Sequence, residues 1–224
     1  MSDPSPTGWS DLAEPWRAAF ARAWTAYSRG NIGVGAAMTE ASGKIVARGR
    51  NRVADAEAPS GHLHGSFIAH AEIDLLGQLS PGDYCDHRLF TTFEPCALCS
   101  VAIVMSNVGH IAFAAADPLW RDLTRLKDVD PFMAERWPER TGPLRDPIAG
   151  FAGLLPLFWF LRRKPDGVVV QAFSDHRPHL LALARTLDTD PAWTALGEGD
   201  VELALARVSA ELTALQGYDV GEIP

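Results

Sequence analysis

The strongest constraint on this chain is a pair of cysteines, Cys96 and Cys99, at the start of an apolar segment. Residues 97–108 (ALCSVAIVMSNV) predict a helix that is apolar on nearly all sides and is therefore buried. Side chains three residues apart at a helix start can point to one side, where the helix dipole favours thiolates. Because the chain has only 3 cysteines, the pair predicts metal or redox chemistry and not a disulfide framework.

A second motif, His70-Ala71-Glu72, lies at the start of another predicted helix, residues 67–79. His70 can add a neutral nitrogen to the two thiolates. One nitrogen and two sulfurs form the three-ligand arrangement of a catalytic zinc, whose fourth position is left to water. Glu72 follows two residues later, which places a carboxylate beside the metal for proton transfer. We therefore predict that zinc is held by His70 and the two cysteines, and that Glu72 is the catalytic residue.

The alternative is a zinc site with a purely structural role, which needs a fourth protein ligand. The side chains available for that position are His62, His64, His87 and Cys85. Glu72 favours the catalytic interpretation, because a structural site has no use for a proton carrier. His62 and His64 lie in a polar, glycine-flanked loop, for which exposure to solvent is the simpler expectation. We also assign His64 to the substrate-binding residues, at the mouth of the pocket.

The rest of the chain alternates between predicted helices and strands. Helices are expected over residues 14–29, 67–79, 97–108 and 149–163, and strands over residues 33–39, 44–51, 88–93 and 111–115. The first two strands form a hairpin, and the alternation after residue 65 predicts parallel strands with helices packed on the sheet. Residues 168–173 (VVVQAF) predict a fifth strand, and Pro156 is expected to kink or break its helix.

Together, the HAE and EPCALC motifs resemble the signature of the cytidine/deoxycytidylate deaminase superfamily, H-x-E followed by P-C-x-x-C. The likeness covers about residues 15–120 and points to the branch that holds guanine, cytosine and tRNA adenosine deaminases. It implies zinc as the cofactor and an α/β fold, a three-layer α/β/α sandwich around a mixed five-stranded sheet. A mainly helical C-terminal extension is expected here. We divide the chain into a zinc deaminase core, residues 1–120, and a C-terminal part, residues 121–224, that completes the sheet.

The same resemblance implies which residues contact the substrate. Asn51, at the end of the second predicted strand, matches an asparagine that hydrogen-bonds the base, and Ala71 offers its backbone N–H. Asp117 follows the last of the four strands and belongs to the same set. Trp120 lies at a strand edge where α/β ligand sites form, so that core packing and base stacking are both open to it. Family members are commonly dimers or tetramers, which makes a homodimer the expected assembly.

The formal net charge of −8 disfavours a surface built to hold a polyanion. Arg48, Arg50 and Arg52 alternate along a predicted strand, with Asn51 on the opposite face, which favours a solvated charged face over a phosphate site. No apolar run is long enough to span a bilayer, and the acidic, proline-containing N-terminus lacks the pattern of a signal peptide. A cytoplasmic protein without membrane or nucleic-acid partners is therefore expected.

The sequence thus predicts a zinc-dependent hydrolase that removes an exocyclic amino group from a nucleobase, nucleoside or similar aminated heterocycle and releases ammonia. The alternative within the same superfamily is a tRNA or other nucleic-acid adenosine deaminase, against which the acidic charge argues. The alternative from another class is a catalytically silent, zinc-stabilised binding domain, which the presence of Glu72 disfavours. The motifs themselves do not specify the heterocycle.

Overall fold

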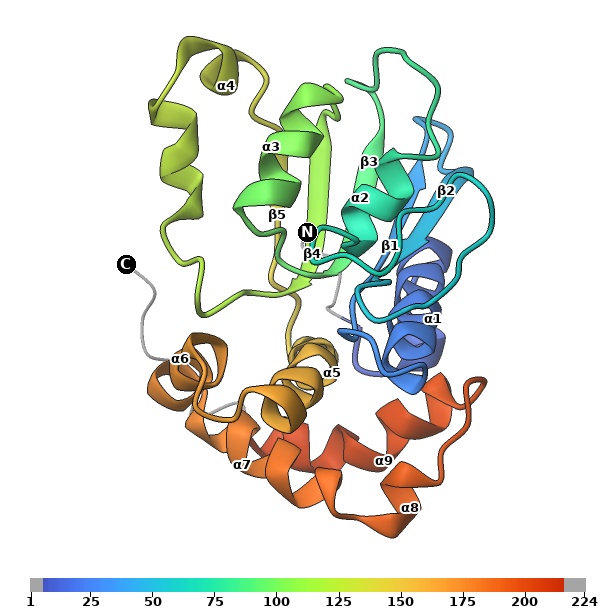
Figure 1. Cartoon of the computed structure of the whole chain (residues 1–224), viewed down its shortest axis with the longest axis vertical. Coiled ribbons are helices and arrows are strands. Elements are labelled where there is room, and N and C mark those ends of the chain that lie inside the picture. The colour runs from blue at the N-terminus through green and yellow to red at the C-terminus, as the bar shows by residue number, and fades with distance from the viewer. Residues whose placement is uncertain (1–5, 216–224) are drawn as a thin grey trace.

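A computed structural model of the chain describes residues 6–215, with a five-stranded sheet at its centre (Figure 1). In chain order, the elements are η1 (Trp9–Asp11), α1 (Glu14–Ser28), β1 (Gly35–Thr39), β2 (Ile45–Arg50), α2 (Ala71–Leu76), β3 (Arg88–Phe93), α3 (Ala97–Met105), β4 (His110–Ala115), η2 (Leu123–Asp128), α4 (Pro131–Glu135), β5 (Glu139–Thr141), α5 (Ile148–Arg163), α6 (Val168–His176), α7 (Pro178–Asp188), α8 (Pro191–Thr194) and α9 (Val201–Ala214). Figure 1 shows α6 to α9, in orange to red, gathered at one end of the molecule.

The sheet is mixed and has the strand order β2-β1-β3-β4-β5. β1 pairs antiparallel with β2 and with β3, whereas β3 and β4, and then β4 and β5, run parallel. The predicted hairpin and the predicted parallel strands beyond residue 65 are both confirmed. β2 forms one free edge of the sheet, and the short β5 forms the other.

Helices cover both faces of this sheet. On one face, Leu75 of α2 and Ile103 of α3 pack into a core cluster with residues of β3 and β4. On the other face, α1 and α5 share a larger cluster that continues into α6, α7 and α9. Glycine permits the close approach of α1, because a Cβ atom at Gly35 would lie 2.2 Å from the carbonyl oxygen of Ala19. The predicted three-layer α/β/α architecture with C-terminal helices is therefore confirmed.

The prediction of a strand over residues 168–173 is wrong. The segment Val168–His176 is helix α6, and the fifth strand is instead Glu139–Thr141. Valine favours strands only weakly, and here Val170 and Phe173, three residues apart, are both buried on one side of a helix. β5 carries no apolar pattern, because its three residues are Glu, Arg and Thr. It joins the sheet through its parallel backbone pairing with β4. Pro156 also leaves α5 unbroken, since the helix continues through it to Arg163.

Two helices near the cysteine motif differ from expectation in extent or exposure. α2 begins only at Ala71, so Phe67 and Ile68 belong to the preceding turn, where they are exposed. α3 was expected to be buried on all sides, but only one side is. Leu98, Val101 and Met105 point away from the core and are exposed. Within residues 6–215, no helix has both the length and the apolar character needed to cross a bilayer.

Candidate active site

The three predicted zinc ligands are brought together by the starts of α2 and α3. His70 is the N-cap residue of α2, and Cys96 is the N-cap residue of α3, with Cys99 in the first turn that follows. β3 ends at Phe93, so only a short connection separates this strand from the first cysteine. Both helix starts meet near the same end of the sheet, and this arrangement delivers one nitrogen and two sulfur atoms to one point.

The spacing of these three side chains fits a zinc ion. Cys96 Sγ lies 3.5 Å and Cys99 Sγ 3.4 Å from His70 Nδ1. In a tetrahedral site with bonds of about 2.0 Å to nitrogen and about 2.3 Å to sulfur, the two donor atoms are about 3.5 Å apart. Among residues 6–215, the donor atoms of these three side chains form one group within 4.8 Å. His62, His64, His87 and Cys85 do not belong to that group.

The protonation of the two thiols is unequal. Cys99 and His70 donate hydrogen bonds to Cys96 and lower the pKa of Cys96 to about 4, although burial acts in the opposite direction. The pKa of Cys99 is raised, because its thiol donates to Cys96, lies buried and faces Glu72. The two sulfur atoms and the carboxylate lie within hydrogen-bond distance and share few protons. Such a cluster is suited to bind a soft divalent cation.

Glu72 is the side chain next to this cluster, with a residual exposure of 3%. Its Oε1 accepts a hydrogen bond of 2.6 Å from the hydroxyl of Thr91, and its Oε2 lies 3.3 Å from Cys99 Sγ. Burial raises the pKa of Glu72, and the hydrogen bond from Thr91 partly opposes that effect. A carboxyl with a raised pKa beside a metal site has the character of a proton carrier.

A cavity of about 200 Å³ opens at the predicted zinc ligands. Several predicted site residues line it together, namely Asn51, His70, Ala71, Glu72, Cys96, Asp117 and Trp120. Asn51 Oδ1 accepts a hydrogen bond of 3.1 Å from the backbone N–H of Val53, which fixes the orientation of its side-chain amide. His64 is not among the lining residues; it is exposed, with its Nδ1 3.4 Å from the carbonyl oxygen of Asp55.

Asp117 is a second buried carboxyl in this cavity. Burial raises its pKa to about 7, an effect that the nearby charges of Glu94 and Cys96 strengthen. Asp117 Oδ1 accepts a hydrogen bond of 2.8 Å from the backbone N–H of Leu119. Glu94 is held in turn by Arg140 of β5, whose Nη2 donates to it at 2.8 Å.

The wall of the cavity that faces the zinc ligands was not predicted from the sequence. It is formed by the C-terminal helices, through Pro156 and Phe160 of α5 and Val169 and Phe173 of α6. These positions carry no motif. The nearest available signal was the apolar character of α5 itself. Thr91 was also missed, although it lies two residues before Phe93 on the strand that leads to the cysteines.

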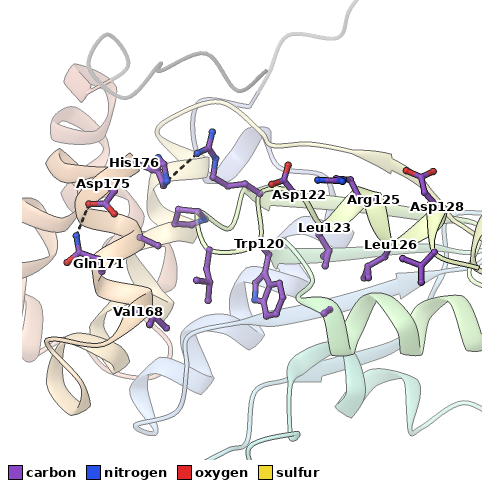
Figure 2. A pocket seen from close by; sticks show the side chains of 16 residues that line it. Trp120, Asp122, Leu123, Arg125, Leu126, Asp128, Val168, Gln171, Asp175 and His176 are labelled. Atoms are coloured by element: carbon purple, nitrogen blue, oxygen red, sulfur yellow. Dashed lines mark hydrogen bonds between the residues drawn. The ribbon is translucent and has the colours of Figure 1, made fainter.

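A larger cavity of about 1110 Å³ adjoins the zinc cavity, and Leu119 and Trp120 line both. Figure 2 shows its two sides, the segment from Trp120 to Asp128 on one and α6, with Gln171 and Asp175, on the other. Its charged side chains have both signs, two arginines against three aspartates (Arg121, Arg125, Asp122, Asp128 and Asp175). The cavity is therefore large, but its lining is not a continuous positively charged surface.

The expectation of a solvated face for the alternating arginines is wrong for two of them. Arg48 is exposed, but Arg50 and Arg52 are buried and form ion pairs with Asp55 and Asp74. Alternation along a strand indicates which side chains share a face, but it does not show what covers that face. Here the loop after β2 and helix α2 supply the carboxylates.

Comparison with known proteins agrees with this geometry. Residues 11–115 match the family described as the cytidine and deoxycytidylate deaminase zinc-binding region. A tRNA-specific adenosine deaminase from Aquifex aeolicus is 31% identical over 101 residues, which cover 45% of this chain and 64% of that protein. A tRNA(Ile)-lysidine synthase from Deinococcus radiodurans is 32% identical over 123 residues, which cover 53% of this chain and 19% of that protein.

Among solved structures, a guanine deaminase from Nitrosomonas europaea is 23% identical, with a TM-score of 0.44, over 66% of this chain and 85% of that one. The chain spans less than two thirds of the length of both curated relatives named above. The family match lies over the residues that carry the metal ligands. Residues 11–115 of this chain, which include the zinc-binding motif at His70, Cys96 and Cys99, thus match the cytidine and deoxycytidylate deaminase zinc-binding region.

Proposed function

We propose that this protein is a zinc-dependent hydrolase that deaminates a nucleobase, a nucleoside or a similar aminated heterocycle and releases ammonia. The observation that carries this proposal is the zinc cavity. Its volume of about 200 Å³ is below the range of about 300–1,000 Å³ typical of sites for larger ligands, which favours a single heterocycle. One side of the cavity offers hydrogen-bonding groups, and the other side is apolar, as a flat ring with polar edges requires.

The polar side can orient the ring. Because Asn51 Oδ1 is engaged by Val53, its Nδ2 group is the donor left for an acceptor on the substrate. Ala71 is the first residue of α2, where a backbone N–H has no partner within the helix and can serve as a second donor. Trp120, Phe160 and Asp117 also line the cavity. In this proposal the two aromatic side chains contact the faces of the ring, and Asp117 contacts its edge.

Glu72 is the residue that moves protons in this proposal. When zinc is bound at His70, Cys96 and Cys99, it supplies Lewis-acid chemistry that lowers the pKa of water. Glu72 accepts a proton from the water that attacks the amino-bearing carbon and gives a proton to the adjacent ring nitrogen. It then accepts the remaining proton from the hydroxyl group now on that carbon and delivers it to the amine. The carbon–nitrogen bond breaks, a carbonyl is left on the ring, and ammonia departs.

The experiment is an ammonia-release assay of the purified protein over free bases, nucleosides and synthetic aminated heterocycles. Glu72→Ala is expected to keep its zinc and lose ammonia release, whereas Cys96→Ser is expected to lose zinc by elemental analysis. Full activity of Glu72→Ala, or unchanged zinc in Cys96→Ser, would contradict the assignment of roles.

A tRNA adenosine deaminase is the second candidate function. Curated relatives carry that name, and the larger cavity beside Trp120 could accommodate the remainder of a bigger substrate. The mixed charges of that cavity and the net charge of −8 favour the small molecule, because contacts with nucleic acids are made mainly from arginine and lysine to phosphate. Ammonia release from tRNA, with no activity on the small heterocycles, would reverse this order.

We further propose a homodimer, formed through the exposed apolar surface of α3 and the turn before α2. This surface consists of Phe67, Ile68, Leu98, Val101 and Met105. Phe67 is 76% exposed and Met105 is 64% exposed, and burial of such apolar side chains in an interface would remove them from water. The division into a core of residues 1–120 and a C-terminal part of residues 121–224 is retained as a proposal about roles, the first part for chemistry and the second for the shape of the cavity.

A further inference from the structure

A separate cavity of about 310 Å³ lies beside the edge strand β2. It shares no lining residue with the zinc cavity. α1, β2, the following loop and α2 contribute its lining, which consists of Arg22, Val46, Ala47, Arg48, Arg50, Arg52, Pro59, His62, Asp74 and Gln78. Four arginines around one small cavity stand out in a chain whose net charge is −8.

Two of these arginines are fixed in place by buried carboxylates. Arg50 Nη2 donates to Asp55 at 2.5 Å, and Arg52 Nε donates to Asp74 at 3.1 Å. Asp74 also accepts from the backbone N–H of Arg50 and contacts the ring of His62 at 2.6 Å. Both carboxylates are thus occupied by local partners, Arg50 and Arg52 among them, and these two guanidinium groups need no reorganisation to form a rigid wall.

The other two arginines have no such compensation. Across residues 6–215, the guanidinium groups of Arg22 and Arg48 form neither an ion pair nor a hydrogen bond, and Arg48 accepts from Gln78 only through its backbone carbonyl. Two carboxylates therefore face four arginines, which leaves a surplus of two positive charges. The pKa of Arg22, whose exposed side chain is desolvated only in part, is lowered first by that desolvation and then by the charges of Arg48, Arg52 and Arg50, which the charge of Asp74 opposes. An anion between these groups would relieve that repulsion.

Protection of the sheet edge does not account for the cluster. A charged residue on an edge strand discourages pairing with another molecule, and Arg48 could serve that purpose alone. It explains neither Arg22, which belongs to α1, nor the burial of Arg50 and Arg52 behind a cavity. The combination of two rigid and two uncompensated guanidinium groups is instead the chemistry that recognises a phosphoryl group, since the planar fork of arginine can bind two of its oxygens at once.

We propose that this cavity binds a phosphoryl group of a small phosphorylated ligand, held by Arg22 and Arg48 against the wall formed by Arg50 and Arg52. The cavity is small enough for one or two phosphoryl groups, and the acidic remainder of the chain disfavours a longer polyanion. Arg50 also donates to the carbonyl oxygen of Asn51, so the ligand would contact the segment that carries a lining residue of the zinc cavity.

The test is titration of inorganic pyrophosphate into the zinc-containing full chain by calorimetry at physiological ionic strength. The test variant is Arg22→Gln with Arg48→Gln, and the matched control is Arg125→Gln with Arg185→Gln. All four positions are exposed, and each double variant removes two positive charges. We expect one pyrophosphate per chain, an affinity at least tenfold lower in the test variant, and a change of less than twofold in the control. Unchanged zinc content and thermal unfolding show that both variants are folded.

Three results would overturn the proposal. They are no binding of pyrophosphate to the unaltered protein, equal weakening in both double variants, and binding that does not depend on Arg22 and Arg48. A parallel titration with a short single-stranded RNA distinguishes the source of the phosphate. If only the RNA binds and its binding is lost in the Arg22 and Arg48 variant, the small phosphorylated ligand is excluded. None of these readouts depends on deaminase activity, so the site can be tested whatever the substrate proves to be.

Discussion

Thr91 shows how a single residue outside the motifs can bear on the chemistry. Its hydroxyl has one proton but two acceptor neighbours, Glu72 Oε1 at 2.6 Å and the carbonyl oxygen of Phe93 at 3.1 Å. Both contacts are hydrogen bonds at the same time only when Glu72 carries a proton and donates it to Thr91. Thr91 is therefore suited to hold the carboxyl in position in its protonated and in its ionised form.

Thr91→Val is expected to reduce kcat about tenfold, with little change in KM and in zinc content. The loss of a hydrogen bond to a charged group costs about 1.5–3 kcal/mol, and about 1.4 kcal/mol corresponds to a factor of ten in rate. The neighbouring Thr92→Val is the matched control, because Thr92 is equally buried but accepts from the backbone of Gly35 and does not contact Glu72. A pH profile of kcat that moves in Thr91→Val but not in Thr92→Val would identify a positioning role; equal effects in both variants would contradict it.

Asp117 gives stability a dependence on pH. Its pKa of about 7 in the folded chain lies above the ordinary value of 3.8, so between these values the folded state keeps a proton that the unfolded state has lost. Stability is therefore lost as pH rises through this range. In Asp117→Asn the amide oxygen can still accept from Leu119, but the titration is gone. We measure the Tm of both proteins by thermal unfolding and subtract that of the unaltered protein from that of the variant. This difference is expected to become more positive from pH 5 to pH 8. A difference that stays constant over this range would refute the expectation.

At the scale of elements, α5 and α6 provide the apolar wall opposite the zinc ligands. The ring of Phe93 at the end of β3 stacks on Phe173 of α6, with their centroids 6.4 Å apart. This contact joins the strand that leads to the cysteines with a helix about eighty residues further along the chain. Short-range sequence patterns do not report such long-range contacts, which is why this wall could not be foreseen.

Phe160→Ala is expected to widen the cavity and to raise kcat/KM for nucleosides relative to the matching free bases by about tenfold. Removal of a ring vacates space for a larger substrate, and contacts of this size change discrimination by about 1–3 kcal/mol. Phe132→Ala is the control, because Phe132 is an exposed phenylalanine of α4 that lines neither the zinc cavity nor its larger neighbour. An unchanged ratio in Phe160→Ala, with activity retained, would remove Phe160 from the specificity-determining wall.

The sequence predicted the elements near the motifs far better than those of the C-terminal half. Apolar periodicity and turn residues located α1, the hairpin β1–β2 and the strands β3 and β4 within a few residues. The short β5 and helix α6 depend on tertiary packing, so local propensity pointed to a strand at Val168 and to none at Arg140. The zinc ligands were foreseen for a related reason, because their spacing is local. The burial of Arg50 and Arg52 depends on carboxylates of other segments and was not foreseen.

At the scale of the whole molecule, the exposed face of α3 is the basis for the proposed assembly. Met105→Glu combined with Val101→Glu is expected to convert a dimer into monomers, because a charge has to be buried in the interface. The control variant is Leu203→Glu. Leu203 is an exposed leucine of α9 and does not belong to the proposed interface, so this substitution should leave the dimer intact. Light scattering after size-exclusion chromatography measures the mass directly. A monomer in the unaltered protein, or a dimer that survives the double substitution, would refute this interface.

The zinc cavity is built from two parts of the chain that have different sequence requirements. The ligand side depends on a few residues whose identity the metal dictates, whereas the opposite side needs only apolar side chains of suitable size on α5 and α6. Substitutions in these two helices can therefore alter which heterocycle is accepted while the metal site stays intact. Homologues with identical HAE and EPCxxC motifs need not share a substrate, and exchange of the segment from α5 to α6 between them offers a direct route to changed specificity.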